Sequence, residues 1–476
     1  MTHQRSTGGA TAIPAHFQPA PEQGVGVIFP SGMLGAGFTA ESVKRGIAMG
    51  ATAIAIDGGS TDSGPHYLGA GVSKSASSAV ERDLRILLTA ACANGIPLIV
   101  GSCGTSGTDA GVDWVAGIAV RIAEQERLSF LMARIYSELD PAAVIDAIGQ
   151  GRVRGLPPQG DLSPETVRSC SHIVALMGHE PIAAALRAGA QVVLAGRATD
   201  TSMVASVALT HGMPAGPAWH AAKTVECGGQ CTTSPTAGGV FVRIDDGGFT
   251  VTPLSPEAAC TPVSVAAHMM YENADPFRLL EPTGTLDTAD ATYRALDDRT
   301  VRVEGSRFEH SARPTAKLEG ARLAGYETIA LVGIRDPGIL GRLGIWLDFL
   351  RTVLADRVSS ALGLDPQEYR IDLRCYGADA VLGPLEDTAG PPREVGLLFK
   401  VRAATQQLAT AIAKTANPLL LHLPLPGMDY LPSFAFATSP AEIERGASYE
   451  FVLNHVLELE QGTGPFRTVL SEVAHA

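Results

Sequence analysis

The chain has 476 residues, of which 45% are hydrophobic and only 18% charged, so most of its segments can be buried in a large core. The formal net charge is −13 and no run of Lys or Arg occurs, which argues against nucleic acid or an anionic membrane as a partner. No apolar run is long enough to span a membrane and the N-terminus lacks a secretory pattern, so we expect a cytoplasmic protein.

The cysteines and the N-terminus give two further expectations. The seven cysteines are irregularly spaced and contain no CxxC pair, so neither a disulfide framework nor a zinc ribbon fits them. We expect reduced thiols. Residues 1–23 are rich in Thr, Gly, Ala and Pro, which is typical of a flexible tail.

From residue 24 to residue 212, short apolar runs alternate with amphipathic segments. The expected strands are Val25–Phe29, Ala51–Ile56, Pro97–Val100, Leu128–Ile135, His172–Met177 and Gln191–Ala195. The expected helices are Ala40–Met49, Ala79–Ala93, Val112–Glu126, Pro141–Gly149 and Pro181–Ala188. This alternation predicts an α/β domain over 24–212, with a mostly parallel sheet and flanking helices. It leaves an open doubly wound sheet and a partial barrel as alternatives.

The pattern changes after Gly212, and we expect a second domain of α+β type over 213–476. Its first part holds the short strands Val240–Ile244, Phe249–Pro253 and Thr300–Val303, and the helix Ser264–Ala274. Its last part holds the helix Leu340–Leu362, the strands Tyr369–Cys375 and Glu394–Arg402, and the helix Thr405–Thr415. That order predicts a split βαβ arrangement in the C-terminal part.

Four loops that follow expected strands combine glycine with small polar residues and, in most of them, a carboxylate. They are Ser31–Gly37, Asp57–Tyr67, Ser102–Asp109 and Arg197–Ser202. Because the carboxyl ends of parallel strands lie at one edge of a sheet, we expect these loops to converge on one pocket. The long polar loop that begins at Asp57 is the expected active-site loop.

The glycines do not form a nucleotide-binding motif. Gly32, Gly35 and Gly37 lack the GxGxxG order, and no GxxxxGK[ST] occurs, so we do not expect a dinucleotide cofactor. The backbone amides of Gly101–Gly107 can hold a carboxylate or phosphate, which Arg197 can bind with both arms of its guanidinium.

Three side chains are candidates for acid/base catalysis or for binding a divalent metal, the one cofactor that we consider. Asp57 and Asp62 belong to the expected active-site loop. His268, Tyr271 and Glu272 share one face of the expected helix Ser264–Ala274. This face can bind a metal together with Asp57 or Glu226, or His268 can act as a base oriented by Glu272. A surface His–Glu pair is the alternative reading.

Further polar residues are assigned to substrate binding. Ser60, Ser102 and Thr105 are expected to hydrogen-bond a substrate carboxylate that is paired with Arg197. The remaining residues of this group are Tyr67, Ser106, Asp200, Glu226 and Lys317. Cys103, near an expected helix start, is a candidate nucleophile, with inert packing as the alternative.

Several segments in the expected order resemble the acyclic terpene utilisation family, AtuA. They are PSGMLGAGF, AIDGGSTDSGPHYLGAG, HEPIAAALRAGAQVVLAGRATD, CTPVSVAAHMMYE, VEGSRFEHSARPTAKLEGA and GYETIALVGIRDP. The resemblance implies catabolism of acyclic terpenes through geranoyl-CoA, with a lyase step on a branched hydroxyacyl-CoA and a small companion protein. It supplies no catalytic residues. The segment Cys227–Cys231 departs from the family's small-residue segment at this place, which leaves the substrate open.

Three functions are consistent with these observations. The first is an enzyme of lyase or hydratase type that acts on a small carboxylic acid or an acyl thioester such as an acyl-CoA. The second is a hydrolase in which Cys103 or a serine acts with His268. The third is a non-catalytic accessory subunit that binds a small carboxylate. We expect an oligomer of identical chains, with the companion protein as a further partner.

Overall fold

A computed structural model describes residues 23–387, 390–460 and 464–474 of the chain. The chain forms two compact units, of which unit 1 comprises Met1–Arg322 and Phe451–Ala476, and unit 2 comprises Leu323–Glu450. The expected flexible tail, 1–23, lies outside the described residues except for Gln23. Among the helices that the structure describes, none is both long enough and apolar enough to cross a bilayer.

Unit 1 is built on a ten-stranded sheet in the order β12-β13-β9-β8-β1-β2-β3-β7-β4-β20. Its parallel strands are β1 (Val25–Phe29), β2 (Ala53–Asp57), β3 (Leu98–Gly101), β7 (Val192–Ala195) and β4 (Phe130–Tyr136). Antiparallel strands extend both edges: β20 (Arg467–Val473) on one side, and β8 (Val240–Asp245), β9 (Gly248–Pro253), β13 (Val301–Glu304) and β12 (Thr292–Ala295) on the other. The sheet is therefore open.

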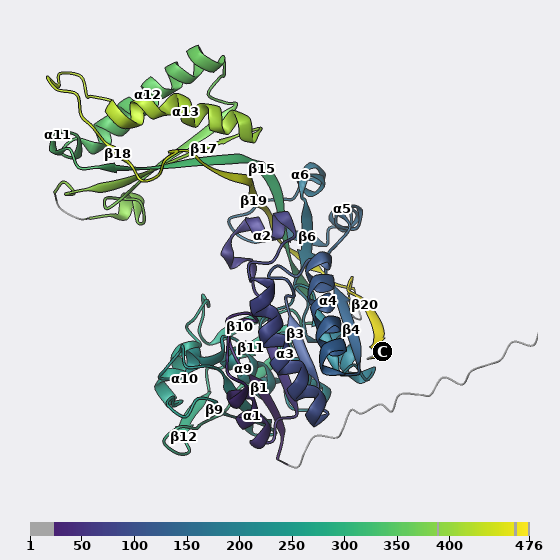
Figure 1. Cartoon of the computed structure of the whole chain (residues 1–476). Helices are drawn as coiled ribbons and strands as arrows, with labels where there is room; N and C mark the ends of the chain where they lie inside the picture. Colours follow the sequence, from purple (N-terminus) through teal and green to yellow (C-terminus); the bar gives the residue numbers. More distant parts are fainter. Residues whose placement is uncertain (1–22, 388–389, 461–463, 475–476) are drawn as a thin grey trace, which may run out of the picture. The chain divides into compact units, whose positions relative to one another are not determined.

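Helices cover both faces of this sheet (Figure 1). Alternate residues of β2 enter different cores, because Ile54 and Ile56 face one layer of helices and Ala53 and Ala55 face the other. The first layer holds α1 (Ala40–Ala48), α3 (Ser77–Asn94) and α4 (Asp109–Glu126). The second holds α5 (Pro141–Gly149), α7 (His179–Arg187), α8 (Ser202–Thr210) and α9 (Ala215–Val225). For residues 24–212, the prediction of parallel strands with flanking helices is confirmed.

The structure does not divide the chain at residue 212, where the composition changes. Strand β8 pairs antiparallel with β1 from Val25↔Ile244 to Phe29↔Val240, so the segment after 212 continues the first sheet. Its other elements are α10 (Pro262–His268) and a small sheet of β10 (Arg278–Glu281), β11 (Gly284–Asp287) and β14 (Arg307–His310). A shift in composition marks a change from parallel to antiparallel pairing here, and the two units separate further along, at residues 322 and 451.

One strand of the expected parallel series belongs to another sheet. β6 (His172–Ala175) pairs antiparallel with β15 (Thr315–Ile334), from Leu318↔Ala175 to Ala321↔His172. A buried apolar run shows that a strand forms, but it does not show which strand becomes its neighbour. The short elements α2 (Pro65–Ala70), β5 (Val153–Gly155) and α6 (Pro164–Ser169) complete unit 1.

Unit 2 is a split βαβ sandwich, as the order of its elements predicts. Its sheet runs β16-β17-β15-β19, with β16 (Tyr369–Tyr376), β17 (Val395–Ala403) and β19 (Ile443–Glu458), and the short β18 (Ala435–Phe436) also pairs with β15. Helices α12 (Leu343–Leu362) and α13 (Gln406–His422) lie on one face of this sheet, and α11 (Pro337–Leu340) precedes them (Figure 1). Phe399 and Trp346 are fully buried in the core between the sheet and the helices.

We expect the Phe399→Ala substitution to destabilise unit 2 by about 3–5 kcal/mol, because it leaves a cavity in a closely packed core. The matched control is Leu398→Ala, since Leu398 precedes Phe399 on β17 and is only partly buried. The control should cost less than about 1 kcal/mol. Amide hydrogen exchange in β16 and β17 measures both effects. Equal protection in the two variants would show that this core does not hold the unit together.

Candidate functional site

The loops that follow β1, β2, β3 and β7 meet at one edge of the ten-stranded sheet of unit 1. Three backbone hydrogen bonds join them: Leu34 N to Asp57 O at 2.7 Å, Gly58 N to Gly101 O at 2.7 Å, and Arg197 N to Gly107 O at 3.2 Å. Gly107 permits the last of these approaches, because its φ is +67° and a Cβ atom there would lie 2.1 Å from Arg197 N. The structure therefore brings together the four loops that the sequence singles out.

Arg197, which follows β7, is buried where these loops meet. Its Nε lies 3.0 Å from Glu319 Oε2. Its Nη1 donates to Ser102 Oγ at 3.2 Å and lies 3.8 Å from Asp200 Oδ1. Its Nη2 reaches Thr61 Oγ1, in the short helix η1 (Thr61–Ser63), at 3.5 Å. All three nitrogens of the guanidinium thus contact other side chains of the protein. The sequence predicts that Arg197 pairs with a substrate carboxylate instead.

Glu319 on β15 compensates this buried cation. The second oxygen of Glu319 accepts a hydrogen bond from Lys317 Nζ at 2.9 Å, and Thr61 Oγ1 donates to the first at 3.0 Å. Burial alone would raise the pKa of Glu319, but the charges of Arg197 and Lys317 outweigh it and lower that pKa to about 2. Glu319 is therefore ionised at neutral pH.

A second buried cation lies on α9, a helix that is buried on every side because it packs between β8, β9 and α8. Lys223 near its end donates to Glu226, the residue at its C-cap, and both side chains are more than nine-tenths buried. Burial raises the pKa of Glu226 to about 8, because the single ammonium of Lys223 only partly offsets the lost hydration.

Three more carboxylates belong to the same cluster. Asp57 is 5% exposed, and its Oδ1 has no hydrogen-bond partner within the described part of the chain. Burial and the nearby charge of Asp200 raise the pKa of Asp57 well above its ordinary value. Burial also raises the pKa of Asp200, against the opposing charges of Arg197 and Lys223. We call Asp57, Asp200, Glu226 and Glu281, with Arg197 and Lys223, the acidic centre.

Glu281, at the end of β10, connects the acidic centre to a cavity. Both of its carboxylate oxygens lie 3.0 Å from Thr201 Oγ1, and burial raises its pKa to about 8. Glu281 also lines a cavity of about 680 Å³ in unit 1, together with Thr199 and Lys317. A protonatable carboxylate and a cation therefore face a space large enough for a small organic ligand.

His268 is positioned differently from the sequence prediction. Helix α10 ends at His268 rather than at Ala274, and Glu272 has a φ of +57°, which an α-helix cannot contain. The expected common helical face of His268, Tyr271 and Glu272 is therefore not formed. The rings of His268 and Tyr271 nevertheless stack, with centroids 5.7 Å apart.

The metal ligands expected from the sequence are only partly brought together. A group of donors that can hold a metal consists of Glu226, Cys227 and His268, whose ligand atoms lie within 4.8 Å of one another. Of the expected ligands, His268 and Glu226 belong to this group, and Asp57 and Asp62 do not. Asp62 is exposed and accepts a hydrogen bond from Ser60 Oγ at 2.7 Å.

The remaining candidates mostly support the loops. Thr105 Oγ1 accepts a hydrogen bond from Lys74 N at 2.9 Å, and Ser106 Oγ donates to Tyr67 O at 3.3 Å. Cys103 is fully buried, and burial together with the nearby Asp57 raises the pKa of its thiol. The thiolate needed for nucleophilic attack is therefore disfavoured at Cys103.

Sequence reasoning missed Lys223, Glu281 and Glu319. Lys223 carries a signal, since it stands alone in a small-residue run three positions before Glu226. Glu319 also carries a signal, since it is two positions from Lys317 in a strand and both side chains therefore lie on the same face. Glu281 carries none, because it follows a short segment with an exposed Arg and an exposed Leu.

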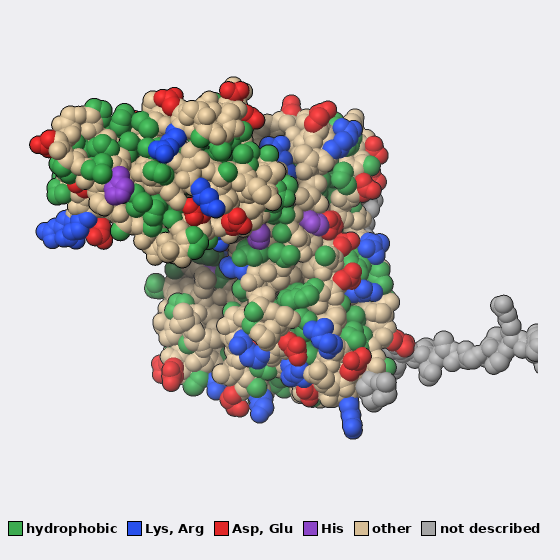
Figure 2. Space-filling model, turned by 45° about the horizontal axis from the view of Figure 1, so that its top comes forward, with side chains coloured by type: hydrophobic (Ala, Val, Ile, Leu, Met, Phe, Trp, Pro, Cys, Tyr) green, Lys and Arg blue, Asp and Glu red, His purple; other side chains and the backbone are tan. Residues whose placement is uncertain are grey.

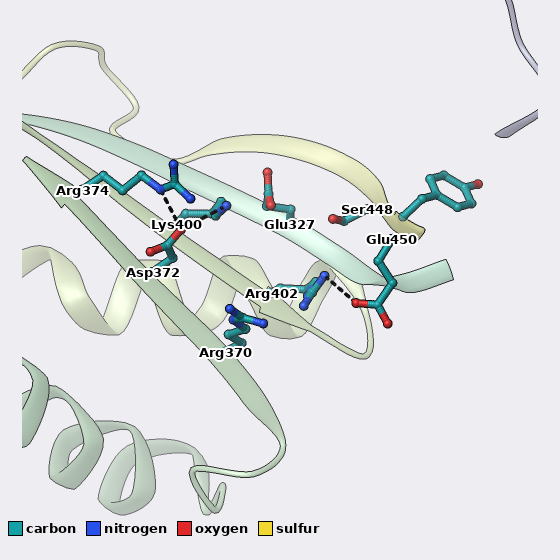
Figure 3. Close-up of a pocket in the computed structure, with 9 residues that line it drawn as sticks. Glu327, Arg370, Asp372, Arg374, Lys400, Arg402, Ser448 and Glu450 are labelled. Atoms are coloured by element: carbon teal, nitrogen blue, oxygen red, sulfur yellow. Dashed lines mark hydrogen bonds and ion pairs between the residues drawn. The ribbon is translucent and has the colours of Figure 1, made fainter. Parts of the chain in front are cut away.

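Unit 2 has a pocket of its own on the sheet face opposite its helices (Figure 3). Its cavity of about 270 Å³ is lined mainly by charged side chains of the four strands. Most of these charges pair with one another: Asp372 lies 3.1 Å from Arg374 and 3.2 Å from Lys400, and Arg402 lies 3.9 Å from Glu450. Basic and acidic side chains are likewise interspersed over the face drawn in Figure 2. We therefore place the candidate site in unit 1, where burial raises the pKa values of four clustered carboxyl groups.

Fold and site together define an α/β protein with a protonatable carboxylate cluster at the carboxyl edge of an open sheet. A family model, described as acyclic terpene utilisation family protein AtuA, matches residues 76–445. The chain belongs to the AtuA family, as its motifs predict, and this membership implies a role in acyclic terpene utilisation. Neither a curated protein nor a solved structure matches the chain.

We expect Glu319→Gln to destabilise the chain by about 3–5 kcal/mol at pH 7, because it leaves the buried Arg197 uncompensated. The folded pKa of Glu319, about 2, lies below its ordinary value of 4.5. Its charged form therefore stabilises the fold above about pH 4.5, and this contribution is lost as the pH falls toward 2. The difference between wild type and variant should shrink over that range.

Chemical denaturation at a series of pH values measures this difference. The control is Glu394→Gln, which removes an exposed carboxylate 3.5 Å from Arg335 and should cost less than about 1 kcal/mol. A Glu319→Gln variant as stable as this control at pH 7 would contradict the role assigned to the Arg197–Glu319 pair.

Proposed function

We propose that this protein is an enzyme of lyase or hydratase type that acts on a small carboxylic acid or an acyl thioester. Such reactions need a base that removes a proton next to a carbonyl group, and an acid that protonates the leaving oxygen or carbon. Both roles suit carboxyl groups whose pKa values lie near neutral pH. The family's role in acyclic terpene utilisation is consistent with an acyl substrate, because the sequence resemblance implies catabolism through geranoyl-CoA.

The observation that carries the proposal is Glu281, a carboxyl group with a pKa raised to about 8 by burial, on the wall of a 680 Å³ cavity. At neutral pH this group holds a proton, so it can act as a general acid toward a ligand in the cavity. Lys317 lines the same cavity and supplies a positive charge for a carboxylate or a thioester oxygen.

The rest of the acidic centre supports this acid. Beyond the effect of burial, the pKa of Glu281 is raised by the charges of Glu226 and Asp200 and lowered by the charge of Lys223. Burial also raises the pKa of Asp200, and it raises the pKa of Glu226 to about 8, so Glu226 can exchange protons near neutral pH. Arg197 is a positioning residue in this scheme, since its guanidinium is saturated by Glu319, Ser102 and Thr61.

The alternative of a cysteine hydrolase gains less support. It requires a reactive thiolate at Cys103, whose thiol has a raised pKa because it is buried and lies near Asp57. It also requires His268 as its base, and burial lowers the pKa of His268 to about 4, which makes it a weak base at neutral pH.

We expect Glu281→Gln to lower kcat by about 10²–10⁴-fold on an active substrate, because glutamine cannot donate the proton. The wild-type rate should fall above pH 8, as Glu281 loses its proton, and this limb should be absent from the variant profile. The matched control is Glu309→Gln, which changes an exposed carboxylate in the wall of the same cavity and should leave the rate nearly unchanged.

The assay uses the full chain and a set of branched 3-hydroxyacyl-CoA thioesters and their unsaturated counterparts, with products identified by mass spectrometry. Lys317→Ala serves as a second variant, and it should raise KM more than it lowers kcat, because Lys317 binds the substrate rather than moving a proton. A Glu281→Gln variant with the wild-type rate and pH profile would refute the proposed role of Glu281.

A further inference from the structure

Three side chains that can ligate a metal lie close together at the C-terminal ends of α9 and α10. Glu226 is the C-cap residue of α9, and Cys227, which follows it directly, is the N-cap residue of the short helix η2 (Gly228–Cys231). His268 is the last residue of α10. Their ligand atoms, a carboxylate oxygen, a thiol sulfur and a ring nitrogen, all lie within 4.8 Å of one another.

The local structure holds these side chains in place. A capping box fixes the start of α10, because Thr261 Oγ1 accepts from Ser264 N and Ser264 Oγ accepts from Thr261 N, both at 3.0 Å. Ser264 Oγ also donates to Cys231 O at 2.9 Å and so ties α10 to η2. The two elements that carry Cys227 and His268 are therefore positioned relative to each other before any ligand binds.

The imidazole of His268 has an unused ligand atom. His268 is 5% exposed, and its Nε2 has no hydrogen-bond partner within the described residues. A neutral imidazole binds a metal through such a nitrogen. A buried nitrogen with a free lone pair beside a thiol and a carboxylate needs a partner.

The surrounding charge also favours a cation. Lys223 lies beside Glu226, but Asp200 and Glu272 also act on Cys227 and Glu226, so carboxylates exceed ammonium groups around the cluster. A metal ion bound to the three donor atoms would supply the positive charge that this arrangement lacks.

We propose that Glu226, Cys227 and His268 form a binding site for a transition-metal ion of the Zn²⁺ class. Sulfur and imidazole ligands favour Zn²⁺ over Mg²⁺ or Ca²⁺, which prefer oxygen ligands. Three protein ligands are typical of zinc sites that keep a fourth position for water or substrate. Donor atoms in a tetrahedral zinc site lie roughly 3–4 Å apart, so the three groups need to close by only about 1 Å.

This inference deepens the proposed function, because Glu226 belongs to the acidic centre, but it can be tested without any activity. Metal-free chain is titrated with Zn²⁺ and, separately, with Co²⁺, whose absorption spectrum reports a thiolate ligand. We expect about one ion per chain, a cobalt–thiolate band, and proton release on binding, seen as a buffer-dependent enthalpy in calorimetry.

Substitutions of the ligands should weaken metal binding. We expect Cys227→Ser to remove the cobalt–thiolate band and His268→Gln to weaken binding of Zn²⁺ at least tenfold. The matched control is Cys92→Ser, which changes a cysteine on α3 outside the cluster and should leave the band and the affinity unchanged. Circular dichroism checks that each variant is folded.

Alkylation of the wild-type chain gives a test that needs no variant. Mass spectrometry locates labelled cysteines, and Zn²⁺ should protect Cys227 from iodoacetamide while the labelling of Cys92 stays the same. A folded wild-type chain that binds neither ion, or a His268→Gln variant that binds as tightly as the wild type, would overturn the metal site. If the chain binds stoichiometric metal but shows no turnover, the proposed function is refuted and the metal site stands. If the titrations fail but the metal-free chain turns over substrate, the metal site is refuted and the proposed function stands.

Discussion

The structure of unit 1 depends on one buried cation, the guanidinium of Arg197. It lies where the loops after β2, β3 and β7 meet, and it holds them together through Thr61, Ser102 and Glu319. A buried Arg requires a compensating charge, and Glu319 supplies it from β15, more than a hundred residues further along the chain. The pair therefore fixes the sheet edge relative to a distant strand, and the acidic centre forms around this fixed point.

The acidic centre differs from an ordinary ion-pair network in its balance of charge. In unit 2, the charged residues of the sheet face are partly exposed and largely neutralise one another. In unit 1, Asp57, Asp200 and Glu281 are gathered around cations that already have other carboxylate partners. Taking a carboxylate out of water without a full counter-charge raises its pKa, and for Glu226 and Glu281 it raises the pKa to about 8, so these two groups hold protons at neutral pH. A proton-transferring site and a metal site are two uses of the same imbalance.

Much of the fold could be predicted from the sequence, because its cause is local. Continuous apolar runs at β1, β2, β3 and β7, each followed by a glycine-rich loop, predict buried parallel strands with their loops at one edge. The split βαβ order of unit 2 follows from helices and strands of clear periodicity. The pairing of β8 with β1 and of β6 with β15 could not be predicted, because neighbouring strands are chosen by tertiary packing.

The site could be predicted in part, for the same reason. Asp57, Arg197 and Asp200 come together because they lie at the carboxyl ends of two parallel strands, β2 and β7, that are separated only by β3. Lys223 and Glu281 come from a buried helix and from a small antiparallel sheet, and nothing in their local sequence shows that these elements border the same cluster. The expected face of His268, Tyr271 and Glu272 failed because the chain turns to a positive φ at Glu272 and ends the helix early.

The proposed chemistry depends on Glu281 carrying a proton at neutral pH. This protonation state is tested most directly by NMR titration of the metal-free chain labelled with ¹³C at the glutamate carboxyl carbons, with Glu281→Gln used to assign the signal. The structure predicts a midpoint near the pKa of about 8 that burial gives Glu281. A midpoint close to the ordinary glutamate value, roughly 4.3, would contradict the account.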